Sequence, residues 1–492
     1  MSLDTSNAAL AERYDAIPYA AVPHPLTTPD RLATVAAFLG LEPAPVAQAR
    51  VLEVGCSDGA NLIPMAAALP GAHFVGCDLS ARAIAAGQRT IDALALSNVT
   101  LVHGDLGALS PSLGSFDYLV AHGVYSWVPP PVRDALFALA QDRLAPKGVM
   151  FVSYNALPGA RVRQAAWDVL HYGTDGIADP RERLAAARRL ARAVADGARS
   201  LYDGDDALRT AFRAIAQKSD SELCHDDLAV PNDPVWFHAF VAHARRFGLD
   251  YLADADLHTM SAAGIEPDAR AYLGTLDPLA REQHLDFVRL RRFRQSLLCR
   301  ADALQGRDLK PQRLLRMHVA ADPSLLRAAE AGKVAELARG LDPAGAGGGP
   351  VRMLLDALVE SAPASTPVAA LLAPALPRPL EAILTDAFVA NIIVLHMQPP
   401  SVVAAAGALP SASALARHQA GTQEQVTNQL HVRVRLPDRN ARALLARLDG
   451  ATDRSALARA MADAGNGLDA VQAPRFVDHA LAQLARLALL VG

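Results

Sequence analysis

The N-terminal third of the chain alternates between short apolar runs and segments with helical spacing. Helices are expected at 61–68 and 81–94, between runs that we interpret as buried strands. The strands are residues 51–54, 74–77, 99–102, 116–121 and 148–154. Strands that are apolar at nearly every position are buried on both faces, which is typical of a parallel sheet. Because the helical crossovers are right-handed, the pattern predicts a doubly wound, Rossmann-like α/β fold.

The alternation stops near residue 171 and resumes about sixty residues later. From 171 to 232 the spacing is helical, with many Ala and Arg residues and no strong strand. A helix at 236–246, a strand at 249–257 and a further strand at 293–298 then return. We therefore expect a first part of the core at 1–170, a helical insertion at 171–233, and the completion of the core sheet at 234–304.

A Gly- and Pro-rich stretch at 342–350 interrupts the rest of the chain and predicts a linker. This defines a middle region with a linker at 305–350, followed by a C-terminal domain at 351–492. Helices interleaved with short strands predict that this domain is mainly helical and winged-helix-like. The predicted elements are a helix at 378–391, strands at 392–397 and 430–436, and helices at 441–448 and 456–464.

The helix at 378–391 is the candidate recognition helix of that winged-helix-like domain. It carries Glu381 and Asp386, and its only basic residue is Arg378 at its start. Two acidic side chains repel phosphate groups, so we expect protein contact or packing rather than contact with nucleic acid.

Composition narrows the functional classes. A chain of 492 residues is too long for one ordinary core, and a net charge of −4 argues against a general nucleic-acid binder. The four cysteines show neither CxxC pairs nor metal-ligand spacing, so we expect no metal site and no disulfide framework. The N-terminus lacks an export signal, and the longest apolar run, 388–397, is too short to span a bilayer. We therefore expect a soluble, cytoplasmic protein without membrane insertion.

The first predicted strand ends in an acidic, glycine-containing loop. Glu53 lies at the strand end, and Gly55, Ser57 and Gly59 follow before the helix. A Walker loop requires GK[ST], and a dinucleotide fingerprint requires G-x-G-x-x-G around a pyrophosphate, and neither is present. Asp58 would moreover repel a phosphate. S-adenosylmethionine (SAM) carries an ammonium and a sulfonium but no phosphate, so an acidic loop favours SAM as the ligand.

The next two strand ends support the same ligand. Asp78 ends the second strand about 20 residues after the loop, where a carboxylate can accept both ribose hydroxyl groups. Asp105 follows the third strand, where it can hydrogen-bond the adenine amino group while its neighbour packs on the ring. Neighbouring residues complete the candidate cofactor contacts: Asn61, Leu79, Ser80 and Leu106.

The loop resembles that of class I SAM-dependent methyltransferases, E/D-x-G-x-G-x-G, with Ser57 at the usual middle glycine. Ser is small, so we expect a slightly tighter loop rather than lost binding. A closer resemblance, to bacterial methyltransferases with a regulatory domain, is carried by residues 14–19, 24–32, 122–129, 153–159, 234–260 and 291–300. That group includes rickettsial-type lysine methyltransferases that act on an outer-membrane surface protein.

The resemblance implies a seven-stranded methyltransferase sheet with SAM as donor and S-adenosylhomocysteine (AdoHcy) as product. It further implies a homodimer, with 171–233 as candidate dimerisation domain, and a protein acceptor methylated at lysine. Two other functions remain open. One is an N- or O-methyltransferase for a small biosynthetic molecule, and the other is a non-catalytic SAM-binding protein that holds a partner.

Candidate acceptor residues follow the fourth and fifth strands. Tyr125 and Trp127 would line an apolar channel that disfavours a charged amine, and Tyr154 and Asn155 would orient it through their oxygen atoms. Core packing is the competing interpretation for Trp127 and Tyr154.

Two further aromatic positions are candidates on the donor side. His122 would contact SAM or fill the wall of its pocket. Tyr14, together with Tyr19, would form a lid over the donor, or belong to an N-terminal helix that packs on the sheet.

Overall fold

A seven-stranded sheet forms the centre of the protein. The computed structural model describes residues 16–197, 206–304, 306, 309–342, 349–371, 376, 378–464 and 467–492. The strands of the sheet are β1 (Arg50–Val54), β2 (His73–Asp78), β3 (Val99–His103), β4 (Phe116–Ala121), β5 (Leu144–Asn155), β6 (Leu249–Asp254) and β7 (Phe293–Arg300).

The strand order is β3-β2-β1-β4-β5-β7-β6. All pairs from β3 to β5 are parallel, whereas β7 is antiparallel to both of its neighbours. The predicted doubly wound α/β class is confirmed, and the sheet is mixed rather than wholly parallel because β7 returns between β5 and β6. The strand order reverses between β1 and β4, and such a switch point places ligands at the carboxyl ends of these strands.

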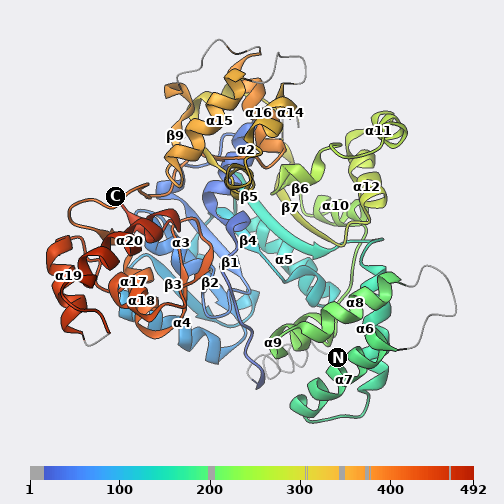
Figure 1. The fold of residues 1–492 in the computed structure, drawn as a ribbon. Coiled ribbons are helices and arrows are strands. Elements are labelled where there is room, and N and C mark those ends of the chain that lie inside the picture. The colour runs from blue at the N-terminus through green and yellow to red at the C-terminus, as the bar shows by residue number, and fades with distance from the viewer. Residues whose placement is uncertain are drawn as a thin grey trace.

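Helices cover both faces of the sheet (Figure 1). On one face α2 (Pro29–Phe38), α3 (Leu62–Ala68) and α4 (Ala81–Leu94) share a core with alternate strand residues. On the other face α5 (Pro130–Arg143) and α10 (Phe237–Arg245) pack over the remaining strand residues. Two further helices, α11 (Pro267–Gly274) and α12 (Pro278–Arg289), lie between β6 and β7 in the chain.

The helical insertion begins at Arg161, ten residues before the expected boundary. It has its own apolar core and projects away from the sheet (Figure 1). Its helices are α6 (Arg161–Gly173), α7 (Pro180–Asp196), α8 (Asp206–Gln217) and α9 (Asp220–Glu222), followed by a π-helical turn over Leu223–Asp227.

A middle unit lies at the opposite end of the sheet from the insertion (Figure 1). This unit contains a small three-stranded sheet of order β10-β8-β9. Its strands are β8 (His318–Ala321), β9 (Thr366–Pro367) and β10 (Ile393–His396). Its helices are α13 (Pro323–Glu330), α14 (Val334–Leu341), α15 (Gly349–Ser361) and α16 (Leu380–Val389). Residues 343–348 of the expected linker lie outside the described residues.

The helix α16 and the strand β10 agree with the predicted helix at 378–391 and strand at 392–397. Their place in the fold differs from the expectation, because neither belongs to the winged-helix-like unit. The strand β10 pairs with β8, and Phe388 of α16 packs edge-on against Phe38 of α2 at 5.9 Å between ring centroids. The expected recognition helix is therefore part of the core that also covers the central sheet.

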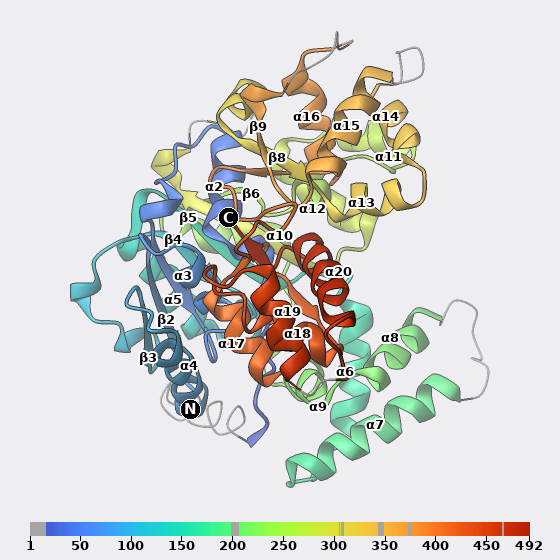
Figure 2. The same cartoon turned by 60° about the vertical axis from the view of Figure 1, so that its left-hand side comes forward.

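The C-terminal unit has a separate apolar core. It comprises β11 (Ser411–Ala412), α17 (Ala414–Thr422), β12 (Gln425–Thr427), β13 (Arg433–Arg435), α18 (Arg439–Leu445), α19 (Arg454–Asp463), α20 (Gln472–Arg486) and β14 (Leu490–Val491). β12 and β13 form an antiparallel hairpin, which we call the wing together with its turn, residues 428–432. The helix α17 contacts α3 and α4, so this unit lies against the first half of the sheet (Figure 2).

Candidate functional site

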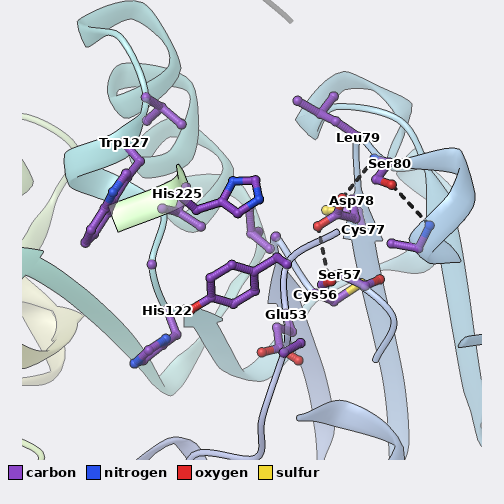
Figure 3. Close-up of a pocket in the computed structure, with 18 of the residues that line it drawn as sticks. Glu53, Cys56, Ser57, Cys77, Asp78, Leu79, Ser80, His122, Trp127 and His225 are labelled. Carbon is purple, nitrogen blue, oxygen red and sulfur yellow. Dashed lines mark hydrogen bonds between the residues drawn. The ribbon is translucent and has the colours of Figure 1, made fainter. Parts of the chain in front are cut away.

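A cavity of about 1010 Å³ opens at the carboxyl ends of the central strands. It is the place where an open α/β sheet binds ligands. Ten of the candidate cofactor residues line it, namely Glu53, Gly55, Ser57, Asn61, Asp78, Leu79, Ser80, Asp105, Leu106 and His122. Figure 3 shows the loop and Asp78 on one side of this space, and His122, Trp127 and His225 on the other.

The loop after β1 is shaped by residues with positive φ. Gly55 and Gly59 have φ of 72° and 73°, and a Cβ at Gly55 would lie 2.9 Å from a methyl carbon of Val124. Gly59, expected to contact the cofactor, does not line the cavity, and a Cβ there would lie 3.0 Å from side-chain carbons of Ile63. Ser57, where the related loops have glycine, adopts φ of 50°, a region that costs a non-glycine residue about 1–2 kcal/mol.

Asp78 ties the loop to the next helix. Its Oδ2 accepts a hydrogen bond from the backbone N–H of Ser57 at 2.8 Å, and its Oδ1 accepts from that of Ser80 at 2.9 Å. Burial raises the pKa of Asp78 above its usual range. The Ser80 hydroxyl in turn caps α4 by accepting from the N–H of Ala83. The carboxylate therefore holds the cavity wall in place while facing the space where a ribose is expected.

Glu53 has one carboxylate oxygen in use and one free. Its Oε1 accepts from the amide Nδ2 of Asn61 at 2.8 Å, whereas its buried Oε2 has no hydrogen-bond partner among the described residues. Burial raises the pKa of Glu53 to about 8, and the nearby Asp78 and Asp58 carboxylates add to the effect. A buried, unpaired acceptor on a cavity wall lacks the partner that buried polar groups require, and an ammonium group of a ligand would supply it. The residues present thus fit SAM.

His122 is held in the cavity wall by a second histidine. Its ring stacks on that of His24 with 3.8 Å between centroids and 23° between planes. Burial, followed by the neighbouring His24, lowers the pKa of His122 to about 3, so the ring is neutral at physiological pH. His122 both lines the cavity and packs, so the two expected roles are compatible.

The acceptor candidates separate into two pairs. Trp127 and Asn155 line the cavity, and the Asn155 amide nitrogen donates to Oδ1 of Asn232 at 2.8 Å. Tyr125 and Tyr154 do not line it, which departs from the expectation.

The two tyrosines belong to an aromatic core on the far side of β5. The Tyr125 hydroxyl lies 2.7 Å from Nδ1 of His243, and the Tyr154 hydroxyl lies 3.1 Å from Oγ of Ser296. The Tyr154 ring also stacks on Phe240 at 4.1 Å. Burying these rings removes a large apolar area from water while both hydroxyls keep partners, which is the packing that buried tyrosines favour.

Of the two expected lid residues, Tyr14 lies outside the described residues, and Tyr19 lines the cavity with its ring edge-on to His225 at 5.6 Å. The residues that sequence reasoning missed come from the insertion. Asp226 and Arg163 of the insertion also face the cavity. No strand-end signal could have found them, because their contact with the site depends on how the insertion folds back.

The parts of the chain that the structure describes contain no cluster of side chains that could hold a metal ion. There, no three His, Cys, Asp or Glu side chains come together as a metal ion would need. Within the same residues, no helix is long and apolar enough to cross a membrane.

Comparison with known families matches three segments of the chain. Residues 51–148 match a methyltransferase domain, 219–300 a predicted methyltransferase regulatory domain, and 409–467 the C-terminal winged helix domain of PKMT. An uncharacterized protein of Rickettsia prowazekii is 32% identical over 234 residues, 47% of this chain and 94% of that protein. The chain belongs to the rickettsial-type family of SAM-dependent methyltransferases. SAM is accordingly the cofactor of this methyltransferase.

A second protein of the same organism is 35% identical to the methyltransferase over 308 residues, 62% of this chain and 56% of that protein. The chain thus spans little more than half the length of that relative. Among solved structures, PKMT2 from Rickettsia typhi superposes with a TM-score of 0.80 at 24% identity, covering 96% of this chain and all of that one. The structure of PKMT2 in complex with AdoHcy gives 0.81. The likeness shows that the fold is shared from the sheet to the winged-helix unit.

Proposed function

We propose that this methyltransferase transfers the methyl group of SAM to lysine side chains of a protein acceptor. The observation that carries the proposal is a single cavity that joins the acidic donor loop to an aromatic, apolar wall. Its volume, about 1010 Å³, lies at the upper end of the range of about 300–1,000 Å³ for pockets that hold one small ligand. It therefore has room for a donor and for an extended side chain beside it.

The donor half is assigned by charge. Glu53 Oε2 would accept from the ammonium group of SAM, Asp78 from the ribose hydroxyls, and Asp105 from the adenine amino group. The remaining donor contacts we propose are Gly55, Ser57, Asn61, Leu79, Ser80, Leu106 and His122. SAM supplies an electrophilic methyl carbon bound to sulfur.

The acceptor half must present a neutral amine. A lysine with a pKa of about 10.4 costs about 4–5 kcal/mol to deprotonate at pH 7, and an apolar surrounding lowers that cost. Trp127 and Pro129 supply such a wall, and Asp226, whose carboxylate pairs with Lys218 at 3.1 Å, also lines the cavity. The lysine nitrogen then forms the new N–C bond as the C–S bond breaks; the electron pair of that bond stays on sulfur, and the amine proton passes to solvent.

Positioning is the main contribution that the chain makes to such a displacement. The amide nitrogen of Asn155 is engaged by Asn232, so its Oδ1 is left to orient the incoming amine. His122, neutral and held against His24, closes the wall between donor and acceptor and excludes water.

The name PKMT, carried by the matched winged-helix domain and by the superposed structure, supports a protein acceptor. We propose a surface or outer-membrane protein as that acceptor, methylated in the cytoplasm by a homodimer that pairs through the helical insertion. The four cysteines are buried and free, in keeping with a reducing compartment.

Transfer of radiolabelled methyl from SAM into fractionated cell extract, followed by mass spectrometry of the labelled species, tests the proposal. Label on protein lysines is expected. Label on a small molecule would overturn the acceptor assignment in favour of a biosynthetic methyltransferase. Binding of SAM that Glu53→Ala abolishes, without any labelled acceptor, would favour a non-catalytic SAM-binding protein.

A further inference from the structure

The wing of the C-terminal unit ends in a tightly built turn. Asn428 Oδ1 accepts from the backbone N–H groups of Leu430 and Val432, at 3.0 and 2.9 Å. Its Nδ2 donates to the backbone carbonyl of Leu487 on the body of the unit. Within this turn His431 takes a left-handed conformation, with φ of 59°. A non-glycine residue adopts that conformation only where its surroundings hold it, so the turn presents His431 in one defined direction.

His431 contacts Asn61, a residue that lines the donor cavity of the methyltransferase core. Its Nε2 lies 2.8 Å from Oδ1 of Asn61, and both side chains are buried. The Asn61 Nδ2 donates to Glu53 Oε1, so its Oδ1 must act as the acceptor. His431 therefore carries its proton on Nε2 and donates. Burial lowers the pKa of His431 to about 3, which keeps the ring neutral.

The Asn61 amide is the hub between the wing and Glu53. Its Oδ1 also accepts from the backbone N–H of His24 at 2.8 Å, and its Nδ2 also donates to Thr27 Oγ1 at 3.0 Å. These four bonds leave the amide one orientation, and through the bond to Oε1 that orientation holds the carboxylate of Glu53, a residue of the cavity lining whose buried Oε2 is unpaired. Removing the His431 donor would leave a buried carbonyl with one bond fewer and loosen the amide.

The wing also contacts an N-terminal segment that lines the donor cavity. Arg433 of β13 donates to the backbone carbonyl of Ala21 at 3.0 Å, and Ala21 lines the cavity. One hairpin thus contacts both the residue that orients Glu53 and the chain segment next to it.

We propose that the wing completes the SAM site, with His431 as a positioning residue that sets the donor affinity through Asn61 and Glu53. The winged-helix unit is thereby coupled to the donor site, and anything that lifts the wing weakens SAM and AdoHcy binding. By reciprocity, a bound donor holds the wing down. The inference rests on the donor half of the proposed function.

Calorimetric titration of AdoHcy into the full chain tests the coupling with two matched variants. In His431→Gln the amide nitrogen lies close to where Nε2 lies in histidine, whereas in His431→Asn it is too short to reach Asn61. Asn adopts left-handed φ more readily than most residues, so His431→Asn preserves the turn. We expect about 5- to 20-fold weaker binding for His431→Asn and recovery of most of the affinity for His431→Gln. Arg435→Ala, at an exposed position of the same hairpin, is the control and should bind as the wild type does.

Equal affinity of wild type, His431→Asn and His431→Gln would overturn the inference, and so would equal weakening in both variants with unchanged melting temperatures. Wild-type protein that binds no AdoHcy would instead refute the proposed function itself. If a variant fails to fold, hydrogen exchange of the wild-type protein provides a second test. Bound AdoHcy should slow amide hydrogen exchange in the wing turn of the wild type, and unchanged exchange there would contradict the coupling.

Discussion

Replacing Glu53 by Gln should stabilise the empty protein at high pH while weakening the donor. The pKa of Glu53 is raised from 4.5 to about 8, chiefly by burial. The folded protein therefore keeps a proton that the unfolded chain releases near pH 4.5, so stability is lost as pH rises from about 5 through 8. At about 1.4 kcal/mol per pKa unit the loss reaches about 5 kcal/mol above pH 8. Gln has the same shape and does not ionise, so Glu53→Gln escapes that loss.

The same proton should leave when the donor binds. An ammonium beside Glu53 Oε2 favours the carboxylate, and with a pKa of about 8 roughly 0.9 of a proton is held at pH 7 in the empty site. Binding of AdoHcy at pH 7 should then release close to one proton, which calorimetry in buffers of different ionisation enthalpy measures. Glu53→Gln should release none from this site and bind about 10- to 100-fold more weakly, because a hydrogen bond to a charged group is lost.

The assay pairs these titrations with urea unfolding of the empty protein from pH 5 to pH 9. Glu42→Gln, which removes an exposed carboxylate on the surface, is the control and should change neither result. If Glu53→Gln and wild type lost stability in parallel over this range, or released the same number of protons, the reasoning from the buried carboxyl would be refuted.

Three further substitutions separate the site from its surroundings. Trp127→Ala should lower kcat/KM for the acceptor about 10- to 100-fold and leave AdoHcy affinity nearly unchanged, because Trp127 lines the cavity on the side away from the loop. An equal loss in AdoHcy binding would argue against that placement. Tyr154→Phe removes a buried hydroxyl that contacts Ser296, and it should lower the free energy of unfolding by about 1 kcal/mol without changing kcat. A large fall in kcat would instead show that Tyr154 takes part in catalysis. Gly55→Ala places a Cβ 2.9 Å from a methyl carbon of Val124 at φ of 72°, so AdoHcy binding should weaken at least about tenfold; unaltered binding would mean that the loop tolerates side chains there.

The sequence alone predicted the methyltransferase half of the fold closely, and the reason is local. A strand buried on both faces is apolar along its whole length, and a loop of acidic and small residues at its end has its own pattern. Both signals lie within a few consecutive residues, so β4 and α4 were predicted with the bounds that the structure has. The Glu53 and Asp78 side chains could be placed at the same edge because carboxyl ends of parallel strands meet there.

The same double burial hid which way the aromatic side chains point. Where both faces of a sheet are covered, alternation of apolar and polar residues no longer tells one face from the other. On β5, Asn155 therefore looked no different from Tyr154, although Asn155 lines the cavity and Tyr154 packs in the core. Tyr125 and Trp127 lie in a 3-10 turn after β4, where strand alternation gives no direction for a side chain.

Contacts between distant segments were decided only by the tertiary structure. The strand β10 was predicted as a strand, but its partner β8 lies far away in the chain. Because β10 pairs with β8, the adjoining helix α16 belongs to the middle unit and not to the winged-helix unit. The bond between Asn61 and His431 depends in the same way on how the C-terminal unit docks. Local sequence determines which elements form, because their hydrogen bonds and burial patterns are short-range. Which elements meet depends on the packing of surfaces that only the folded chain brings together.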